Sequence, residues 1–305
     1  MQTIPGYDGL SRIGAGGTAT VYRATQSQIG REVALKVMVG NAVDAKTSKQ
    51  FSREARALGT LGWHPNIVVL FDAGVTDAGT AYIAMEYVAG GSLVDRERMT
   101  PQEVARVGIR IAGALHCAHD AGVLHRDVKP ANILVDVLGQ VKLADFGISG
   151  LVDATNTTGG GMTLLHVPPE IIDGGQADIR SDVYSLGSTM FELLTGRAPF
   201  QGDNPEAVGQ MLLAIMDSPV PDLRPWGVPN TLAGAIEQAM AKSADQRPQS
   251  AAEFGRALQE VERSEGWPAT DLPLPTSQAP ATPDRQTPQA AGSDTIPMSQ
   301  MPPTP

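Results

Sequence analysis

We expect an α+β fold with two lobes: a small β-rich lobe that carries one helix, followed by a larger and mainly helical lobe. Residues 7–85 consist mostly of strand-forming segments separated by turn residues, whereas residues 92–264 show the apolar spacing of helices. Gly90-Gly91 stands between the two regions, and such a pair is typical of a hinge. The expected boundaries are therefore 7–85 for the small lobe, 86–91 for the hinge and 92–264 for the large lobe.

The small lobe is expected to contain strands around one helix. Residues 18–24 and 32–37 are rich in β-forming residues and are separated by turn residues. Residues 49–61 have helical character, and residues 82–88 form a further strand that runs into the hinge. The order of these elements predicts a sheet with one interposed helix.

A glycine-rich segment lies between two of the expected strands. It contains Gly14, Gly16 and Gly17, and glycines let a hairpin backbone approach phosphate groups closely. A dinucleotide-binding turn also begins Gly-x-Gly, but a helix follows the turn in that case, whereas a strand follows here. The segment therefore favours a phosphate-binding hairpin.

The large lobe shows clear helix signals. Thr100-Pro101-Gln102-Glu103 is a capping box with proline at the first helical position. The apolar residues that follow recur at helical spacing: Val104, Val107, Ile111 and Leu115. Ser250-Ala251-Ala252-Glu253 predicts a second capping box at the start of the last helix.

The composition is that of a soluble globular protein. The chain has 305 residues, of which 42% are hydrophobic and 18% charged, and its net charge is −10. This balance argues against a nucleic-acid partner. The single cysteine, Cys117, fits a reducing compartment. Because the sequence shows neither a signal peptide nor a long apolar run, we expect a cytoplasmic protein without a membrane segment.

The composition changes near Gly266. From there to Pro305, ten of forty residues are proline, mixed with Ser, Thr, Gln and Ala. Such a segment buries too little apolar surface to offset its ordering entropy. We therefore expect residues 265–305 to form a disordered, proline-rich tail.

Two linked motifs indicate the chemistry. The segment His125-Arg126-Asp127-Val128-Lys129-Pro130-Ala131-Asn132 is followed, thirteen residues after Asn132, by Asp145-Phe146-Gly147. Asp127 can accept the proton of an attacking hydroxyl, and Asn132 and Asp145 can hold Mg²⁺ against ATP phosphates. The pair of motifs therefore predicts phosphoryl transfer.

With these motifs, residues 7–264 resemble a bacterial eukaryotic-type (Hanks-type) serine/threonine protein kinase domain. Pro168-Pro169-Glu170 resembles the sequence that closes the activation segment in this family, and Asp182 resembles the buried aspartate that braces the catalytic loop. Arg247 resembles the arginine that pairs with the closing glutamate. Residues 181–261 look most similar to the soluble kinases of the PknK type. The resemblance implies the bilobal protein-kinase fold.

The resemblance also implies roles in phosphate transfer. Asp127 would be the base and orienting group, and Lys129, at the position typical of serine/threonine kinases, would neutralise the γ-phosphate. Thr163 would hydrogen bond to both residues. Asn132 and Asp145 would bind Mg²⁺, with Mn²⁺ as a possible substitute.

The nucleotide contacts follow from the same resemblance. Lys36 would contact the α- and β-phosphates of ATP and pair with Glu54, although a surface salt bridge of Glu54 with Arg53 or Arg56 is the alternative. Met85 would be the gatekeeper. Further contacts with the nucleotide would come from the glycine-rich segment, the two faces of the adenine pocket, the hinge backbone and the side of the site near the ribose. The residues expected there are Ile13, Gly14, Ala15, Gly16, Gly17, Val21, Ala34, Glu86, Val88, Ser92 and Leu134.

Arg126 suggests a regulatory mechanism. A cation beside the catalytic aspartate is usually balanced by a phosphate on the activation segment, here residues 148–163. This segment contains Thr155, Thr157 and Thr158. We expect autophosphorylation there, with Thr158 as the favoured site.

The sequence thus predicts an enzyme that transfers the γ-phosphate of Mg·ATP to Ser/Thr hydroxyls of proteins and acts in signalling. Its partners would be protein substrates, including a second copy of itself in trans, which leaves a homodimer open. The alternatives are a pseudokinase that acts as a nucleotide-binding scaffold and an interaction protein that uses its tail as bait.

Overall fold

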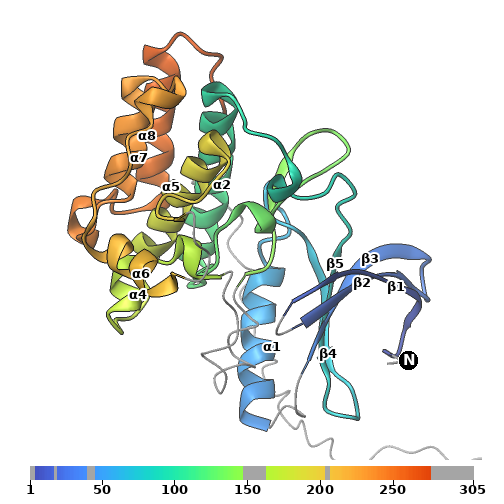
Figure 1. Ribbon diagram of the computed structural model, residues 1–305. Coiled ribbons are helices and arrows are strands. Elements are labelled where there is room, and N and C mark those ends of the chain that lie inside the picture. Colours follow the sequence, from blue (N-terminus) through green and yellow to red (C-terminus); the bar gives the residue numbers. More distant parts are fainter. Residues whose placement is uncertain (1–3, 17–18, 40–44, 147–162, 203–206, 276–305) are drawn as a thin grey trace, which may run out of the picture. The chain divides into compact units, whose positions relative to one another are not determined.

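In the computed structural model, the first part of the chain forms a five-stranded antiparallel sheet with the order β1-β2-β3-β5-β4 (Figure 1). The strands are β1 (Tyr7–Ala15), β2 (Ala19–Gln26), β3 (Arg31–Met38), β4 (Leu70–Val75) and β5 (Ala81–Glu86). β3 is central, and every residue from Val33 to Met38 is buried. A strand covered on both faces reads as a continuous apolar run rather than an alternating one, and this explains the sequence of β3.

One helix, α1 (Ala45–Gly59), lies beside this sheet (Figure 1) and packs against β4. Its buried side chains Phe51, Ala55 and Leu58 recur at helical spacing, so a single stripe faces the core. Glu54 lies between them in the sequence and is partly exposed. The helix expected over 49–61 is present and begins earlier.

The structure describes residues 4–16, 19–39, 45–146, 163–202 and 207–275. The chain divides into a compact unit Met1–Leu274 and a second unit Pro275–Pro305. The described residues up to 274 belong to the first unit.

The large lobe is organised around α2 (Pro101–Asp120), which packs against α5 (Ile179–Thr195) and α8 (Ala251–Ser264). Its N-terminus has the predicted capping box, since Thr100 accepts from the Glu103 N–H and the Glu103 carboxylate accepts from the Thr100 N–H. The other α-helices of this lobe among the described residues are α4 (Pro169–Ile172), α6 (Val208–Asp217) and α7 (Asn230–Ala239).

The second predicted capping box is only half formed. Ser250 accepts from the Glu253 N–H at 3.1 Å, as expected. The Glu253 carboxylate, however, accepts from the N–H of Gln249 at 2.7 Å. The carboxylate therefore caps the residue before the expected one.

A two-stranded sheet of β6 (Ile133–Val135) and β7 (Val141–Leu143) stands between α2 and α5 in the sequence. Ser92, after the hinge, bridges to Leu134 in β6, and Ile67, before β4, bridges to Leu143 in β7. The hairpin thus contacts segments from both sides of the hinge. It brings Asn132, just before β6, and Asp145, just after β7, into one region.

The domain boundary predicted at residue 264 needs correction. The compact unit extends to Leu274, and Trp267 and Leu272 pack against the main core. Residues 265–274 are therefore part of the fold. Their apolar side chains pack against the core, whereas the prediction rested on the proline content of the whole segment. Residues 276–305 lie outside the described residues.

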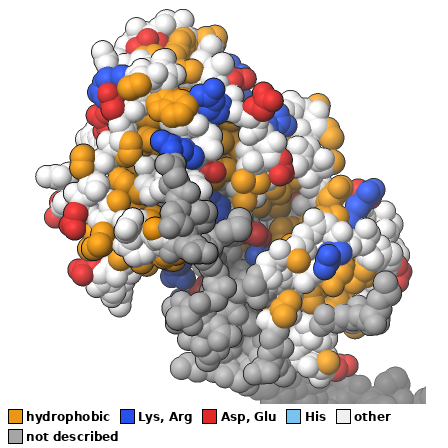
Figure 2. All heavy atoms as spheres, in the orientation of Figure 1, with side chains coloured by type: hydrophobic (Ala, Val, Ile, Leu, Met, Phe, Trp, Pro, Cys, Tyr) orange, Lys and Arg blue, Asp and Glu red, His pale blue; other side chains and the backbone are white. Residues whose placement is uncertain are grey.

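Two properties of the described surface bear on partners. No helix among the described residues is long and apolar enough to cross a membrane. On the face that Figure 2 shows, basic and acidic side chains are interspersed rather than gathered by sign. This face therefore presents no strong field of one sign.

Candidate active site

The loop that carries Asp127 is held by one buried aspartate at the start of α5. Asp182 is 1% exposed and accepts hydrogen bonds from the backbone N–H groups of His125 and Arg126, each at 2.8 Å. It also contacts Nε2 of His119 at 2.8 Å. The bracing role predicted for Asp182 is confirmed.

Burial alone would raise the pKa of Asp182. The hydrogen bonds from the His119 side chain and from the His125 backbone N–H outweigh this effect and lower the pKa, so the carboxylate is charged at neutral pH. Arg126 has a φ of 65°, a left-handed conformation that costs an arginine about 1–2 kcal/mol. The bond to Asp182 helps to hold Arg126 in this conformation, directly before Asp127.

His125 joins the catalytic loop to the segment around Asp145. Its Nδ1 accepts from the Asp127 N–H at 3.2 Å, so the ring proton resides on Nε2, which donates to the Ala144 carbonyl at 2.9 Å. Burial lowers the pKa of His125, which keeps the ring neutral. The ring also contacts Phe146, with 4.7 Å between centroids. His125 is therefore a structural link, not a proton donor to substrate.

The Asp127 carboxylate has two partners, which both contact Oδ2. Lys129 Nζ lies at 2.7 Å, and Asn132 Nδ2 donates to Oδ2 at 3.0 Å and to the Asp127 carbonyl at 2.8 Å. Because both groups near the Asn132 amide nitrogen are acceptors, the amide has one chemically sensible orientation. Its oxygen is therefore turned away from Asp127.

Asp145 lies next to Lys36. Its Oδ1 is 3.0 Å from Nζ of Lys36, which projects from the buried strand β3. Asp145 also has a positive φ, 61°, so two strained residues flank the site. The backbone between them is tied down, since the Ala144 N–H donates to the Asn132 carbonyl at 2.8 Å.

The residues predicted around adenine are brought together in part. Val88 belongs to a small buried cluster with Val68 and Ala144, and Met85 and Leu134 pack against it. A cavity beside this cluster is lined by Lys36, Met85, Ala144, Asp145 and Phe146, among others.

The strand register aligns further nucleotide-site residues. Ala34 is paired with Met85 across β3 and β5, and Val21 is paired with Lys36 across β2 and β3. Gly14 is paired with Val21, while Ile13 is 48% exposed. The glycine-rich hairpin thus continues the strand that borders Lys36.

Sequence reasoning missed an ion pair at the hinge. Lys142 of β7 contacts both carboxylate oxygens of Glu86 at 2.6 and 2.8 Å, and the Val69 N–H donates to the same carboxylate at 3.3 Å. The available signal was the alternation of β7, where Val141 and Leu143 are buried and Lys142 is on the other face. Glu86 is therefore fixed in position by the strand that leads to Asp145.

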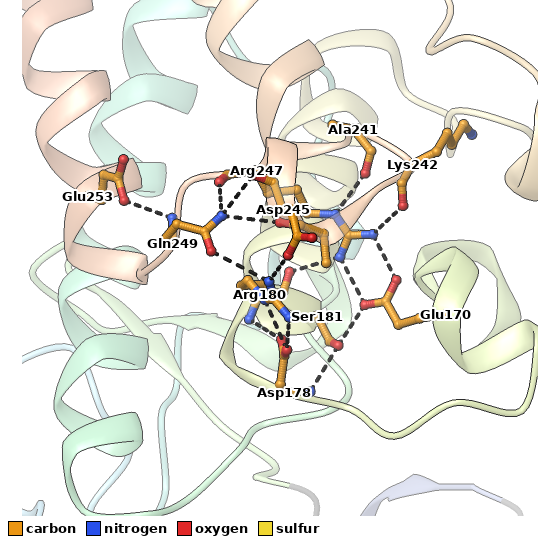
Figure 3. Close-up of polar contacts among 11 residues, drawn as sticks. Glu170, Asp178, Arg180, Ser181, Ala241, Lys242, Asp245, Arg247, Gln249 and Glu253 are labelled. Carbon is orange, nitrogen blue, oxygen red and sulfur yellow. Dashed lines mark hydrogen bonds and ion pairs between the residues drawn. The ribbon is translucent and has the colours of Figure 1, made fainter.

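A buried ion pair anchors the residues that follow the activation segment (Figure 3). Arg247 is 2% exposed, and its two terminal nitrogens contact the two carboxylate oxygens of Glu170 at 2.9 and 2.7 Å. Ser181 of α5 donates to the same carboxylate at 2.7 Å. The predicted Arg247–Glu170 pair is confirmed. Burial opposes the charge of Glu170, but these hydrogen bonds dominate and lower its pKa.

His166 is likewise tied to α5. Its Nδ1 contacts Ser188 Oγ at 2.8 Å, its Nε2 contacts Glu192 at 2.9 Å, and its carbonyl accepts from Ser185 at 2.9 Å. The stretch just before Glu170 thus has a fixed attachment to the helical core.

Several predictions fall partly outside what the structure describes. Gly17, Gly147, and the candidate phosphorylation sites Thr155, Thr157 and Thr158 lie outside the described residues. Thr163 starts a short 3₁₀ turn, but its side chain lies outside them as well. The pairing of Lys36 with Glu54, and the contacts of Thr163, stay predictions.

The chain matches the family model for the protein kinase domain over residues 7–259. It is 39% identical to the serine/threonine-protein kinase PknK of Mycobacterium tuberculosis, over 98% of this chain and 28% of that protein. It is 38% identical to the probable serine/threonine-protein kinase PknB of Corynebacterium glutamicum, over 89% of this chain and 44% of that protein. The chain thus spans less than half the length of these two relatives.

The fold is similar to the crystal structure of the PknI kinase domain of Mycobacterium tuberculosis. The TM-score is 0.66 at 29% sequence identity, and the match covers 85% of this chain and 96% of that one.

Proposed function

The chain belongs to the protein kinase family, and on that premise we propose that it is an ATP-dependent protein serine/threonine kinase. The arrangement around Asp127 carries the proposal. Lys129 and Asn132 both contact Oδ2 of this carboxylate. Asp145, in the segment after β7, lies 3.0 Å from Lys36 of β3. A base, two cations and two metal-binding groups are thus held by one hydrogen-bonded framework.

The protein residues would act mainly by positioning and charge neutralisation. A serine or threonine hydroxyl of the substrate would give its proton to Asp127 as its oxygen bonds to the γ-phosphorus. The bond from that phosphorus to the β,γ-bridging oxygen would break, and ADP would leave. Lys129 would neutralise the transferred group, Thr163 would orient Asp127 and Lys129, and Lys36, oriented by Glu54, would hold the α- and β-phosphates.

The donor set suits a hard cation. Mg²⁺ binds through one or two protein oxygens together with phosphate oxygens. Asp145 offers a carboxylate, and the Asn132 amide oxygen is turned away from Asp127 because the amide nitrogen faces that residue. Mg²⁺, or Mn²⁺ in its place, would neutralise the phosphate charge when held by Asn132 and Asp145.

The nucleotide would lie between the glycine-rich hairpin and the hinge. The common cluster of Met85, Val88 and Leu134 supports an apolar adenine site, with Ala34 beside Met85 in the sheet. The hinge backbone at Glu86 and Val88 would contact adenine. Ser92 would lie near the ribose, and its bridge to Leu134 supports that position.

The pseudokinase alternative is not supported. The relatives named above are described as serine/threonine-protein kinases, and Lys36, Asp127, Asn132 and Asp145 are all present. These residues also contact one another or the catalytic loop. Lys36 contacts Asp145, and Asn132 donates to the Asp127 carbonyl. The Asp127 carboxylate contacts Lys129.

We further propose activation by autophosphorylation in trans at Thr155, Thr157 or Thr158. Arg126 supports this, because its backbone is held by Asp182 while its side chain is exposed, and no partner contacts the guanidinium among the described residues. Protein substrates, a signalling role and a transient homodimer follow from the same proposal. The single cysteine, which is buried, is in keeping with a cytoplasmic location.

A labelling experiment tests the assignment. Purified protein is incubated with Mg²⁺, [γ-³²P]ATP and a generic protein substrate, and the labelled protein is hydrolysed to its amino acids. We expect label on phosphoserine and phosphothreonine that disappears in Asp145→Asn. Asp77→Asn, which changes an exposed aspartate of the β4–β5 loop, is the control and should retain activity. Label on phosphotyrosine alone, or no label on either substrate or enzyme, would overturn the proposal.

Mass spectrometry tests the regulatory part. Active protein should carry phosphate on at least one of Thr155, Thr157 and Thr158, and an excess of wild-type enzyme should add it to the Asp145→Asn protein. Fully active enzyme without phosphate on any of the three would exclude this form of activation.

A further inference from the structure

The chain continues past α8 as a strap, defined here as residues 267–274, that is fixed by hydrogen bonds from its first half. The Trp267 N–H donates to the Glu262 carbonyl at 2.8 Å. Thr270 donates twice to the Glu262 carboxylate, from its N–H at 2.7 Å and from its hydroxyl at 2.6 Å. Gln259 donates to the Thr270 carbonyl at 2.8 Å. Thr270 is 7% and Glu262 2% exposed, so a buried carboxylate of α8 is committed to the strap.

Two helix glycines make room for the second half of the strap. A Cβ on Gly255 of α8 would lie 2.6 Å from Leu272 Cδ1, and one on Gly113 of α2 would lie 2.7 Å from the Pro273 carbonyl oxygen. Neither glycine has a positive φ, and glycine inside a helix costs about 1 kcal/mol relative to alanine. The close passage of the strap is therefore the physical reason for Gly113, and at Gly255 it acts together with Ala112 of α2, whose Cβ would lie 3.2 Å from an added Cβ.

The strap ends on a buried histidine that belongs to the segment between α1 and β4, far from α8 in the sequence. The Pro273 carbonyl lies 3.2 Å from Nε2 of His64, which is 1% exposed and stands between α1 and β4. The Asn66 N–H donates to Nδ1 of the same ring at 3.1 Å, so the ring proton is on Nε2 and points at the strap. Cys117 of α2 also contacts this carbonyl, at 3.9 Å.

The turn that His64 occupies is bonded to the strand before Asp145. Asn66 Nδ2 donates to the Val141 carbonyl at 2.7 Å, and the Leu143 N–H donates to the Asn66 carbonyl at 2.9 Å. A continuous set of hydrogen bonds thus runs from Pro273 through His64 and Asn66 to β7. Asp145 follows two residues after the end of that strand.

We propose that the docked strap is a positioning element of the active site, and that it acts through His64 on the turn 64–66 and on β7 to fix Asp145. This inference rests on the proposed metal-binding role of Asp145. Residues 267–274 then belong to the catalytic unit, and a chain that ends at α8 would lack a support of its own active site.

Displacing the strap from the helix side tests the proposal in the full chain. Gly113→Ala and Gly255→Ala each place a methyl group where the strap passes, while Gly234→Ala in α7 meets nothing within 4 Å and is the matched control. Because alanine favours helix, the three variants should fold. Leu272→Ala removes the strap's own contact without changing a helix.

Two measurements are made on each variant. Hydrogen exchange of the peptide that covers residues 267–274 should be at least about tenfold faster in Gly113→Ala, Gly255→Ala and Leu272→Ala than in wild type, and unchanged in the control. The Mg²⁺ concentration for half-maximal phosphate transfer should rise several-fold in the same variants, with the thermal midpoint of the helical lobe retained. His64→Ala should resemble them, and His64→Gln, which keeps a donor, should lie closer to wild type.

The outcomes separate this proposal from the kinase assignment. Fast exchange of residues 267–274 in wild type would show that the strap is not docked and would overturn the proposal. Fast exchange in the variants with unchanged Mg²⁺ dependence would overturn the positioning role. If the wild type transfers no phosphate, the proposed function fails, and with it the role of the strap, while the exchange data still decide whether the strap docks.

Discussion

Replacement of Asp182 by asparagine should weaken both the fold and the reaction. The aspartate accepts from the N–H groups of His125 and Arg126 and contacts His119 Nε2, all at 2.8 Å, while 1% exposed. Asparagine has the same shape but only one acceptor oxygen, because its NH₂ group is a donor. The new amide can therefore satisfy one of the two backbone N–H groups but not both.

The magnitude follows from these contacts. A buried N–H without an acceptor costs about 1–3 kcal/mol. His119 can adopt the other tautomer and accept from the new NH₂ group, so its contact can survive. We expect Asp182→Asn to lower the free energy of unfolding by about 1–3 kcal/mol. Asp182→Ala, which leaves all three partners without an acceptor, should lower the free energy of unfolding by about 3–5 kcal/mol.

The pH dependence has a definite sign. The pKa of Asp182 in the folded protein lies below its ordinary value of 3.8, so its contribution is fully present above that pH and is lost as the pH falls through the folded pKa. The stability difference between wild type and Asp182→Asn should therefore be constant near neutral pH and shrink in acid.

The activity should fall as well, because Asp182 holds Arg126 at a φ of 65°, one residue before Asp127. We expect kcat to drop at least about tenfold with the KM for ATP little changed, since Lys36 and the hinge are untouched. Urea unfolding followed by tryptophan fluorescence, and kinetics under folding conditions, measure the two effects beside the Asp77→Asn control. Stability within about 0.5 kcal/mol of wild type together with unchanged kcat would refute the reasoning.

Three further predictions concern other parts of the fold. Arg247→Met should cost about 3 kcal/mol in urea unfolding, since it leaves the Glu170 carboxylate half-buried without its cation, and a loss below about 1 kcal/mol would contradict this. Thr100→Ala should cost about 1 kcal/mol by removing the cap of α2, whereas Thr100→Ser should keep most of the stability. Burial raises the pKa of Cys117 to about 11, so a disulfide reagent at pH 8 should modify it only as the protein unfolds, and rapid modification of folded protein would show the thiol to be accessible.

The local elements of the fold were largely predictable from sequence. The apolar run of β3 and the spacing of Val104, Val107 and Ile111 in α2 reflect burial that each segment shows by itself. The Thr100 capping box, whose atoms all lie within four residues, formed as predicted. At Ser250 the same pattern misled, since the Glu253 carboxylate reached the N–H of Gln249 instead.

The strap could not be predicted in this way. Proline content suggested disorder, but Thr270, Leu272 and Pro273 are held by partners as distant as Gly113 and His64. A local sequence pattern does not reveal a groove that forms only where two helices pack side by side. Tertiary contacts of this kind decide whether a proline-rich stretch is ordered.

The candidate site shows the same division. The motifs around Asp127 and Asp145 indicated the chemistry, and resemblance to the family supplied Asp182 and the pair of Glu170 with Arg247, which are 77 residues apart. The Glu86–Lys142 pair was missed because neither residue carries a motif and they meet only when β7 packs beneath the hinge. Pairs of this kind depend on strand placement rather than on spacing.

The most direct measurement is the single-turnover rate of γ-phosphate transfer to a protein hydroxyl in wild type and in Asp127→Asn, with ATP affinity measured in parallel. If Asp127 accepts the proton, the rate should fall at least about 10²-fold while the affinity for Mg·ATP stays within a few-fold. Equal rates in the two proteins, with phosphate still transferred, would contradict the role of Asp127 and with it the central claim.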